Sequence, residues 1–213
     1  MKGCGLKAFS EILYQGPLIT KASKAVILLH GRGGTAHSIL SLVDQLCDSD
    51  FYIAAPQATN NTWYPCSFMA DEKLNEPYLS ASVNDVNDLI EHTSQYIPKH
   101  QIFILGFSQG ACLALEVTTR YAAKYGGIVA FTGGLIGSSI DENKYRGDFG
   151  GTNVFISDGD CDPHIPLIRA EQSKKLMEKL GAHVTLKVYP GRNHTIIEDE
   201  LKFVKENIMC SIK

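Results

Sequence analysis

The chain has 213 residues, of which 44% are hydrophobic and 20% are charged, and its formal net charge is −3. This length and composition are typical of one globular domain with a sizeable core, so we predict a single domain over residues 1–213. The small net charge and the lack of a dense Lys/Arg run argue against nucleic acid or an anionic membrane surface as a partner.

The six cysteines are scattered and form no C-x-x-C pair, so we predict neither a metal site nor a redox pair, and no motif indicates a cofactor. No apolar run reaches the ~18 residues of a membrane span, and residues 1–10 lack the apolar stretch of a signal peptide. We therefore expect a cytoplasmic protein with reduced thiols. A secreted, disulfide-bonded form is the alternative, and the sequence does not indicate an oligomeric state.

In chain order, residues 12–18 predict an edge strand of a hairpin, interrupted by Gly16 and Pro17. After it, short β-branched runs alternate with amphipathic segments. The strands are predicted at residues 25–30, 51–55, 101–106, 128–132, 153–157 and 184–189, and the helices at 38–47, 79–96, 109–125, 167–180 and 196–208. The long crossovers indicate an α/β fold with a mostly parallel central sheet and helices on both faces.

A candidate nucleophile lies between the third of these β-branched strands and the helix that follows it. Gly106, Ser108 and Gly110 form a G-x-S-x-G motif, and this strand-turn-helix setting is typical of a nucleophile elbow. The flanking glycines let the backbone pass closely, and the free N–H groups of the helix N-terminus face developing negative charge. We predict Ser108 as the nucleophile and the Gln109 N–H as an oxyanion donor. The alternative is a plain glycine-rich turn.

A serine hydroxyl needs a base, and in α/β-hydrolases the order along the chain is Ser, then Asp or Glu, then His. Three histidines follow Ser108. His183 opens a predicted strand, at the end of the sheet away from the site, and His164 lies in a loop. His194 follows the last strand, at the edge where strand carboxyl ends collect ligands, and is the predicted base.

The acid is predicted in the loop after the strand at 153–157, which carries three carboxylates. Asp162 is favoured because Pro163 and Pro166 end this loop before the next helix, but spacing alone leaves Asp160 as an alternative. The same residues also suit an acidic surface turn.

Taken together, four segments resemble the phospholipase/carboxylesterase family of small α/β-hydrolases, which includes acyl-protein thioesterases. The resemblance runs from about residue 25 to the C-terminus and rests on His30-Gly31-Arg32-Gly33-Gly34, Gly106-Phe107-Ser108-Gln109-Gly110, Gly159-Asp160-Cys161-Asp162-Pro163-His164-Ile165-Pro166 and Gly191-Arg192-Asn193-His194. It implies an α/β-hydrolase fold without a separate lid domain, Asp162 as the acid and His194 as the base. The family's His-Gly oxyanion loop implies the backbone N–H of Arg32 as the second donor.

The sequence departs from the thioesterase branch at Arg32, where an apolar residue is usual, and in the aromatic loop at residues 61–65. Both departures concern the substrate, and the Arg32 side chain is predicted either to form a salt bridge or to meet an anionic substrate. Two long loops, residues 57–77 and 133–151, are expected to line an acyl pocket. Its predicted substrate-binding residues, each of which could instead pack in the core, are Trp63, Tyr64, Phe68, Leu135 and Ile136.

The predicted function is a serine carboxylesterase that hydrolyses short- or medium-chain acyl esters, with thioesters or lysophospholipids as further substrates, through a Ser108–His194–Asp162 triad. A small-molecule acyl ester is the expected partner. The alternative is a hydrolase-fold protein that binds a ligand without turnover. A dienelactone hydrolase would carry a cysteine at the elbow and a peptidase an added substrate domain, and the sequence indicates neither.

Overall fold

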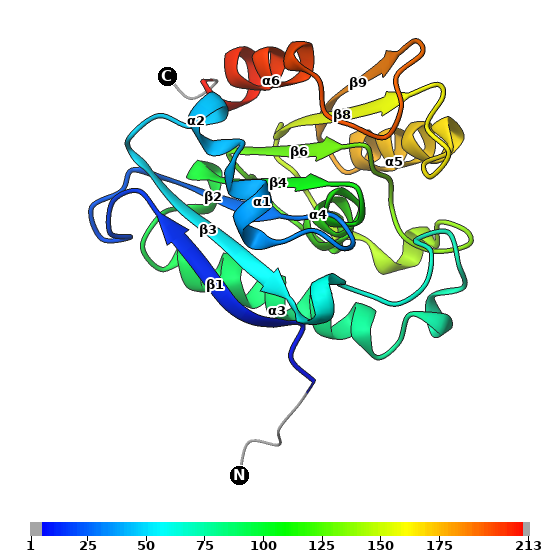
Figure 1. Ribbon diagram of the computed structural model, residues 1–213, viewed down its shortest axis with the longest axis horizontal. Coiled ribbons are helices and arrows are strands. Elements are labelled where there is room, and N and C mark those ends of the chain that lie inside the picture. Colours follow the sequence, from blue (N-terminus) through cyan, green and yellow to red (C-terminus); the bar gives the residue numbers. More distant parts are fainter. Residues whose placement is uncertain (1–5, 211–213) are drawn as a thin grey trace.

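A computed structural model describes residues 6–210 and has a central seven-stranded sheet in the order β1-β3-β2-β4-β6-β8-β9 (Figure 1). Only β1 runs antiparallel to its neighbour, and all other pairs are parallel. The strands are β1 (Phe9–Gln15), β2 (Lys24–Leu29), β3 (Phe51–Ala58), β4 (Ile102–Phe107), β6 (Gly127–Phe131), β8 (Asn153–Gly159) and β9 (His183–Tyr189). The predicted mostly parallel α/β sheet is confirmed.

Helices cover both faces of this sheet (Figure 1). They are α1 (Ala36–Leu40), α2 (Val43–Leu46), α3 (Tyr78–Ser94), α4 (Gln109–Arg120), α5 (Leu167–Lys179) and α6 (Glu198–Val204), with short turns η1 (Thr59–Asn61), η2 (Glu72–Leu74), η3 (Lys99–Gln101), η4 (Glu142–Lys144) and the π-helical η5 (Lys205–Met209). Apolar residues of α3, α4 and α5 pack in one core cluster, and those of α1, α2 and α6 pack in another. None of the helices in residues 6–210 is long and apolar enough to cross a bilayer.

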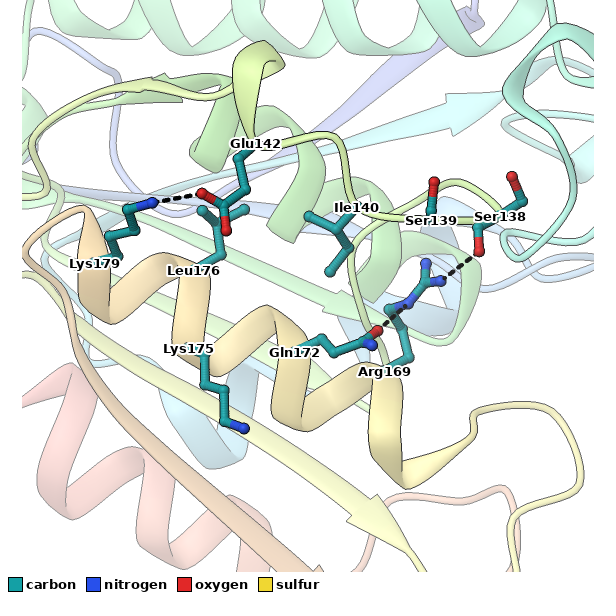
Figure 2. A pocket seen from close by; sticks show the side chains of 9 residues that line it. All are labelled: Ser138, Ser139, Ile140, Glu142, Arg169, Gln172, Lys175, Leu176 and Lys179. Carbon is teal, nitrogen blue, oxygen red and sulfur yellow. Dashed lines mark hydrogen bonds and ion pairs between the residues drawn. The ribbon is translucent and has the colours of Figure 1, made fainter.

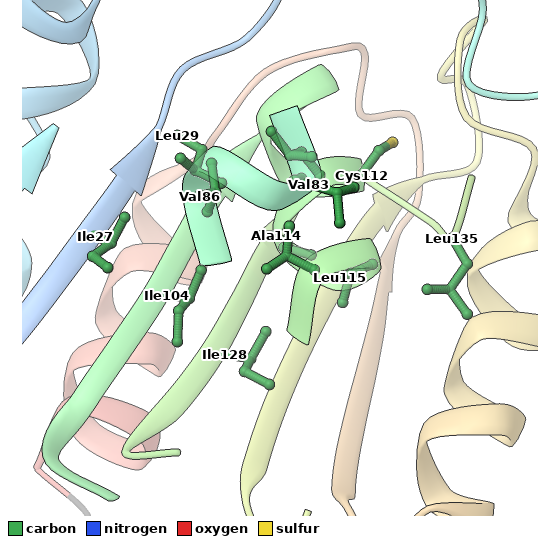
Figure 3. Close-up of a cluster of buried hydrophobic side chains, with 14 of the residues drawn as sticks. Ile27, Leu29, Val83, Val86, Ile104, Cys112, Ala114, Leu115, Ile128 and Leu135 are labelled. Atoms are coloured by element: carbon green, nitrogen blue, oxygen red, sulfur yellow. The ribbon is translucent and has the colours of Figure 1, made fainter. Parts of the chain in front are cut away.

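The alternation of side chains along β2 shows how the sheet separates two cores. Ile27 and Leu29 point to the cluster under α3 and α4, whereas Val26 and Leu28 point to the cluster under α1 and α6. Figure 3 shows the first cluster, where Ile27 and Leu29 lie with side chains of β4, β6, α3 and α4. Burying one such side chain stabilises the fold by about 1.5–3 kcal/mol. Because both faces are covered, the central strands are apolar at nearly every position.

The first strand differs from its prediction. It spans Phe9–Gln15 and is followed by Gly16, whose φ of +78° and close approach to Phe51 leave no room for a side chain. Its partner is β3, not the following strand β2, so the predicted hairpin is wrong although the edge position is confirmed.

Two predicted helices also differ. The helix expected at 38–47 is split into α1 and α2, and Thr35 caps α1 by accepting a hydrogen bond from the Ser38 N–H. The helix expected at 109–125 ends at Arg120, because the next two residues form β5 (Tyr121–Ala122), which pairs with β7 (Arg146–Gly147) in a small second sheet.

Candidate active site

Ser108 occupies a sharp turn between β4 and α4. Its φ of 55° and ψ of −118° lie in a backbone region that residues other than glycine rarely adopt, and this conformation costs about 1–3 kcal/mol of strain. A Cβ atom at residue 110 would lie 2.1 Å from the Leu29 carbonyl oxygen, and one at residue 106 would lie 2.2 Å from the Gly110 carbonyl oxygen. Both glycines are therefore required for this turn, as the sequence motif predicts.

A continuous chain of hydrogen bonds joins three side chains that are far apart in sequence. The Ser108 hydroxyl lies 2.7 Å from His194 Nε2, and His194 Nδ1 lies 2.7 Å from Asp162 Oδ2. These residues follow β4, β9 and β8, whose carboxyl ends meet at the same edge of the sheet. The Asp162 side chain has no exposed area and the His194 side chain is 22% exposed, so this chain of hydrogen bonds is shielded but open on the histidine side.

Asp162 is held as a carboxylate. Its Oδ1 accepts hydrogen bonds from the backbone N–H groups of His164 and Ile165, at 2.8 and 3.3 Å. Burial acts to raise the pKa of Asp162, but these two hydrogen bonds and the one from His194 outweigh it, and the pKa lies below its ordinary value. The alternative acid, Asp160, does not contact the imidazole: its Oδ1 accepts a hydrogen bond from the Gly191 N–H at 2.6 Å.

Two backbone N–H groups, those of Arg32 and Gln109, are placed to receive an oxyanion. Gln109 is the first residue of α4, and neither N–H donates to another residue in the described part of the chain. Both residues line the same cavity as Ser108. Gly31 packs against the elbow, since a Cβ there would lie 3.3 Å from the Ser108 Cβ. The catalytic roles of these groups remain predictions.

His30 fixes the loop that carries Arg32. Its Nδ1–H donates to the Gly31 carbonyl oxygen at 2.8 Å, and its Nε2 accepts from the Ala58 N–H at 3.1 Å. Burial lowers the pKa of His30, against the smaller opposing effect of the hydrogen bond with Gly31, so the ring is neutral at pH 7. The motif identified His30 only by its place in the loop, whereas the structure gives it a positioning role.

A cavity of about 440 Å³ lies in front of Ser108. Of the predicted substrate-binding residues, Tyr64 and Phe68 line it, but Trp63, Leu135 and Ile136 do not. These three are 0–1% exposed and belong to the core, which corrects the prediction. The cavity is lined by Arg32, Tyr64, Pro65, Cys66, Ser67, Phe68, Ser108, Gln109, Cys112, His164, Ile165 and His194.

The aromatic loop is locked to the elbow by the Gln109 side chain. Its Oε1 accepts from the Trp63 N–H at 3.0 Å, and its Nε2 donates to the Tyr64 carbonyl oxygen at 2.8 Å. The Trp63 indole N–H donates to the His30 carbonyl oxygen at 2.8 Å. Trp63 is thus a structural link between the aromatic and oxyanion loops.

The Arg32 side chain forms no salt bridge with a described residue, so that predicted contact is wrong, while a contact with an anionic substrate stays a prediction. Its Nη1 and Nη2 instead donate to the carbonyl oxygens of Pro65 and Cys66, at 2.7 and 2.6 Å. Arg32 therefore ties the oxyanion loop to the wall of the cavity.

The histidine loop is braced by groups that sequence reasoning missed. Arg192 is 6% exposed and donates to the Glu200 carboxylate and the Thr195 carbonyl oxygen, both at 2.7 Å. The His164 ring packs edge-on against the His194 ring, with centroids 4.8 Å apart. The position of Arg192 two residues before His194 could have indicated a role in this loop. Its partner on α6, Glu200, was not predictable from the spacing of residues.

Asp158 is a buried carboxyl group close to Asp162. Its side chain is fully buried, its Oδ1 accepts from the Gly159 N–H at 2.9 Å, and its Oδ2 has no hydrogen-bond partner among residues 6–210. Burial is the main cause that raises the pKa of Asp158 to about 7, despite the opposing hydrogen bond from Gly159. Since its reference pKa is 3.8, the folded protein binds this proton more tightly than the unfolded chain does.

Asp158 therefore makes stability depend on pH. The wild-type free energy of unfolding should fall as pH rises from about 4 to about 7, because the unfolded chain loses the Asp158 proton first. Asp158→Asn removes this dependence, and we expect it to be about 1–3 kcal/mol more stable than wild type at pH 8 but similar at pH 4. Urea unfolding of both proteins across this range measures the difference. Parallel pH profiles would contradict the assignment.

Within residues 6–210, no group of three or more His, Cys, Asp or Glu side chains is arranged to hold a metal ion. The nucleophile elbow and the seven-stranded sheet define an α/β-hydrolase. The chain belongs to the phospholipase/carboxylesterase family, whose sequence pattern matches residues 17–212. The predicted family, fold and serine-hydrolase class are thereby confirmed.

Comparison with known proteins agrees with this assignment. A phospholipase/carboxylesterase crystal structure from Dyadobacter fermentans is 48% identical, covers 97% of this chain and 100% of that chain, and has a TM-score of 0.93. Acyl-protein thioesterase 1 of Saccharomyces cerevisiae is 28% identical over 216 residues, which cover 89% of this chain and 95% of that protein. A Bacillus cereus carboxylesterase structure, 23% identical over 92% of each chain with a TM-score of 0.75, supports the fold alone.

Proposed function

We propose that this chain is a serine carboxylesterase that hydrolyses short- or medium-chain acyl esters through an acyl-enzyme at Ser108. The observation that carries the proposal is the pair of 2.7 Å hydrogen bonds that link Ser108 to His194 and His194 to Asp162 beside an open cavity. A nucleophile, a base and a group that orients the base are the parts that acyl transfer requires.

In the proposed mechanism, His194 Nε2 takes the hydroxyl proton as Ser108 Oγ attacks the acyl carbonyl. Asp162, ionised because of its lowered pKa, keeps the proton of the neutral imidazole on Nδ1 and stabilises the imidazolium that forms. The N–H groups of Arg32 and Gln109 bind the oxyanion. His194 then protonates the leaving alcohol, and water attacks the acyl-enzyme by the same route.

The cavity supports an acyl group of limited length. Its volume of about 440 Å³ is in the lower part of the range for small-molecule sites. Tyr64, Phe68 and Ile165 supply apolar walls. Thioesters and lysophospholipids present the same carbonyl to Ser108, and the yeast relative is named as a thioesterase. We therefore propose acyl-chain length as the main limit on substrates.

The proposal predicts covalent labelling and chain-length selectivity. A fluorophosphonate probe should label the wild type at Ser108, because the activated hydroxyl attacks phosphorus as it attacks carbonyl carbon. With 4-nitrophenyl esters from acetate to palmitate, kcat/KM should be highest for short and medium chains and fall for palmitate. The same series as thioesters measures the leaving-group preference.

A protein that only binds a ligand would neither react with the probe nor turn over any ester. That pair of results would overturn the proposed function in favour of a non-catalytic role. A maximum at palmitate would keep the esterase but contradict the proposed acyl length.

The Arg32 contacts make a further prediction about the cavity wall. Arg32→Ala removes two hydrogen bonds to carbonyl oxygens but keeps the backbone oxyanion donor, so we expect KM for 4-nitrophenyl butyrate to rise about 3–10-fold with a smaller change in kcat. Arg32→Lys keeps the charge and one donor group, so its KM should lie between those of wild type and Arg32→Ala. A large fall in kcat with unchanged KM would contradict this role.

A further inference from the structure

A second cavity, of about 520 Å³, lies between α5 and the loop at residues 138–142. It shares no lining residue with the cavity in front of Ser108. Figure 2 shows side chains from both segments lying around it, with Arg169, Gln172 and Ser138 at one end and Lys179 and Glu142 at the other. It is therefore a separate site in space, not an extension of the esterase site.

The wall of this cavity contains a buried cation. Arg169 is 2% exposed and has no carboxylate within salt-bridge distance in the described part of the chain. Its Nη1 donates to the carbonyl oxygens of Leu135 and Gly137, at 2.9 and 2.6 Å, and its Nη2 to that of Ser138 at 3.2 Å. Burial lowers the pKa of Arg169, and the opposing electrostatic effects of Tyr145, Cys112 and Glu116 are smaller.

One N–H of Arg169 is left over. A guanidinium carries five N–H groups, and the Nε–H donates to Gln172 Oε1 at 3.1 Å, so together with the three carbonyl contacts four are used. The fifth, on Nη2, has no protein acceptor among residues 6–210. Because Arg169 lines the cavity, an acceptor bound there would satisfy both this donor and the charge.

The remaining polar groups of the cavity include several that can donate a hydrogen bond to a ligand. Lys175 is exposed and makes no salt bridge with a described residue, and the hydroxyls of Ser138 and Ser139 make no hydrogen bond within residues 6–210. The Oε1 of Gln172 accepts from Arg169, and its amide N–H groups donate to no residue in the described part of the chain. The only carboxylate among the lining residues, Glu142, is paired with Lys179 at 2.5 Å.

Two apolar side chains complete the cavity. Leu176 is 5% exposed, and in Figure 2 Ile140 and Leu176 lie between Arg169 at one end and Lys179 at the other. A ligand here would meet the Arg169 cation and its neighbouring donors at its head and an apolar strip along its body. We propose that this cavity binds a small organic carboxylate with a short alkyl body, its carboxylate on Arg169, Gln172 and the serine hydroxyls and its alkyl part on Ile140 and Leu176.

The sharpest test is Gln172→Glu, which places a carboxylate of the same shape beside Arg169. Gln172 is exposed on α5, so the change leaves the core intact. Hexanoate is the probe, and its binding is measured by saturation-transfer NMR and calorimetry. We expect saturable binding to wild type, at least tenfold weaker binding to Gln172→Glu, and a higher Tm for that variant because the buried cation gains a partner.

The matched control is Gln45→Glu, the same change at an exposed glutamine of α2 on the other face of the sheet, which should bind hexanoate as wild type does. Hexanol, which lacks the charge, should not bind at this cavity. The proposal is overturned if wild type shows no saturable hexanoate binding, if Gln172→Glu binds it unchanged, or if hexanol binds equally well. None of these readouts depends on turnover at Ser108, so failure here is distinct from failure of the proposed esterase.

Discussion

Ser108→Ala is expected to lower kcat for 4-nitrophenyl butyrate by on the order of 10⁶-fold, close to the rate that binding and the oxyanion donors alone sustain. The hydroxyl lies 2.7 Å from His194 Nε2 and is the nucleophile of the proposed mechanism, so no neighbouring group can replace it. Steady-state kinetics should show this loss of turnover, and the variant should no longer be labelled by a fluorophosphonate.

The fold should survive this substitution, since alanine at residue 108 keeps the turn and its flanking glycines. Circular dichroism and the Tm of Ser108→Ala should therefore match wild type. A variant that folds normally and still hydrolyses the ester at the wild-type rate would refute Ser108 as the nucleophile.

Asp162→Asn is expected to lower kcat by on the order of 10⁴-fold with little change in KM. The backbone N–H groups of His164 and Ile165 hold the amide oxygen, so the amide NH2 faces His194 Nδ1, where the carboxylate accepted at 2.7 Å. The imidazole then adopts the wrong tautomer, and its cationic form loses its partner. Kinetics at pH 7–8 with a short-chain ester measure the effect.

Asp160→Asn is the matched control for this change, two residues away in the same loop. Asn keeps an oxygen that can accept from the Gly191 N–H, so we expect kcat within a few-fold of wild type. Equal losses in the two variants would show that the loop as a whole, and not the Asp162 carboxylate, is what catalysis requires.

The parts of the molecule that could be predicted from sequence are those with local signals. The elbow was predictable because Gly106 and Gly110 flank Ser108 between an apolar strand and a helix. His194 was predictable because it follows a strand whose carboxyl end meets that of the Ser108 strand at one edge of a parallel sheet, whereas Asp162 was preferred over Asp160 through the family resemblance. In both cases the sequence pattern and the geometry express the same constraint.

The predictions that were wrong concern contacts between segments that are distant in the sequence. The β1 edge strand pairs with β3 because the chain crosses back to that side, which no local pattern records. Trp63 was predicted at the cavity since it lies in an aromatic loop, but its indole N–H donates to His30 and turns the ring inward. Leu135 and Ile136 were expected to line the acyl pocket, whereas their N–H groups bind Ser173 and Glu116 and hold them in the core.

The strand order separates His194 from the other two residues of the proposed triad. β4 and β8, which precede Ser108 and Asp162, are flanked on both sides, whereas β9 is the outermost strand and precedes His194. A nascent chain emerging from the ribosome can thus assemble the middle of the sheet while its serine is still inert. During refolding, regained turnover should report when this last strand docks, later than the signal from collapse of the interior.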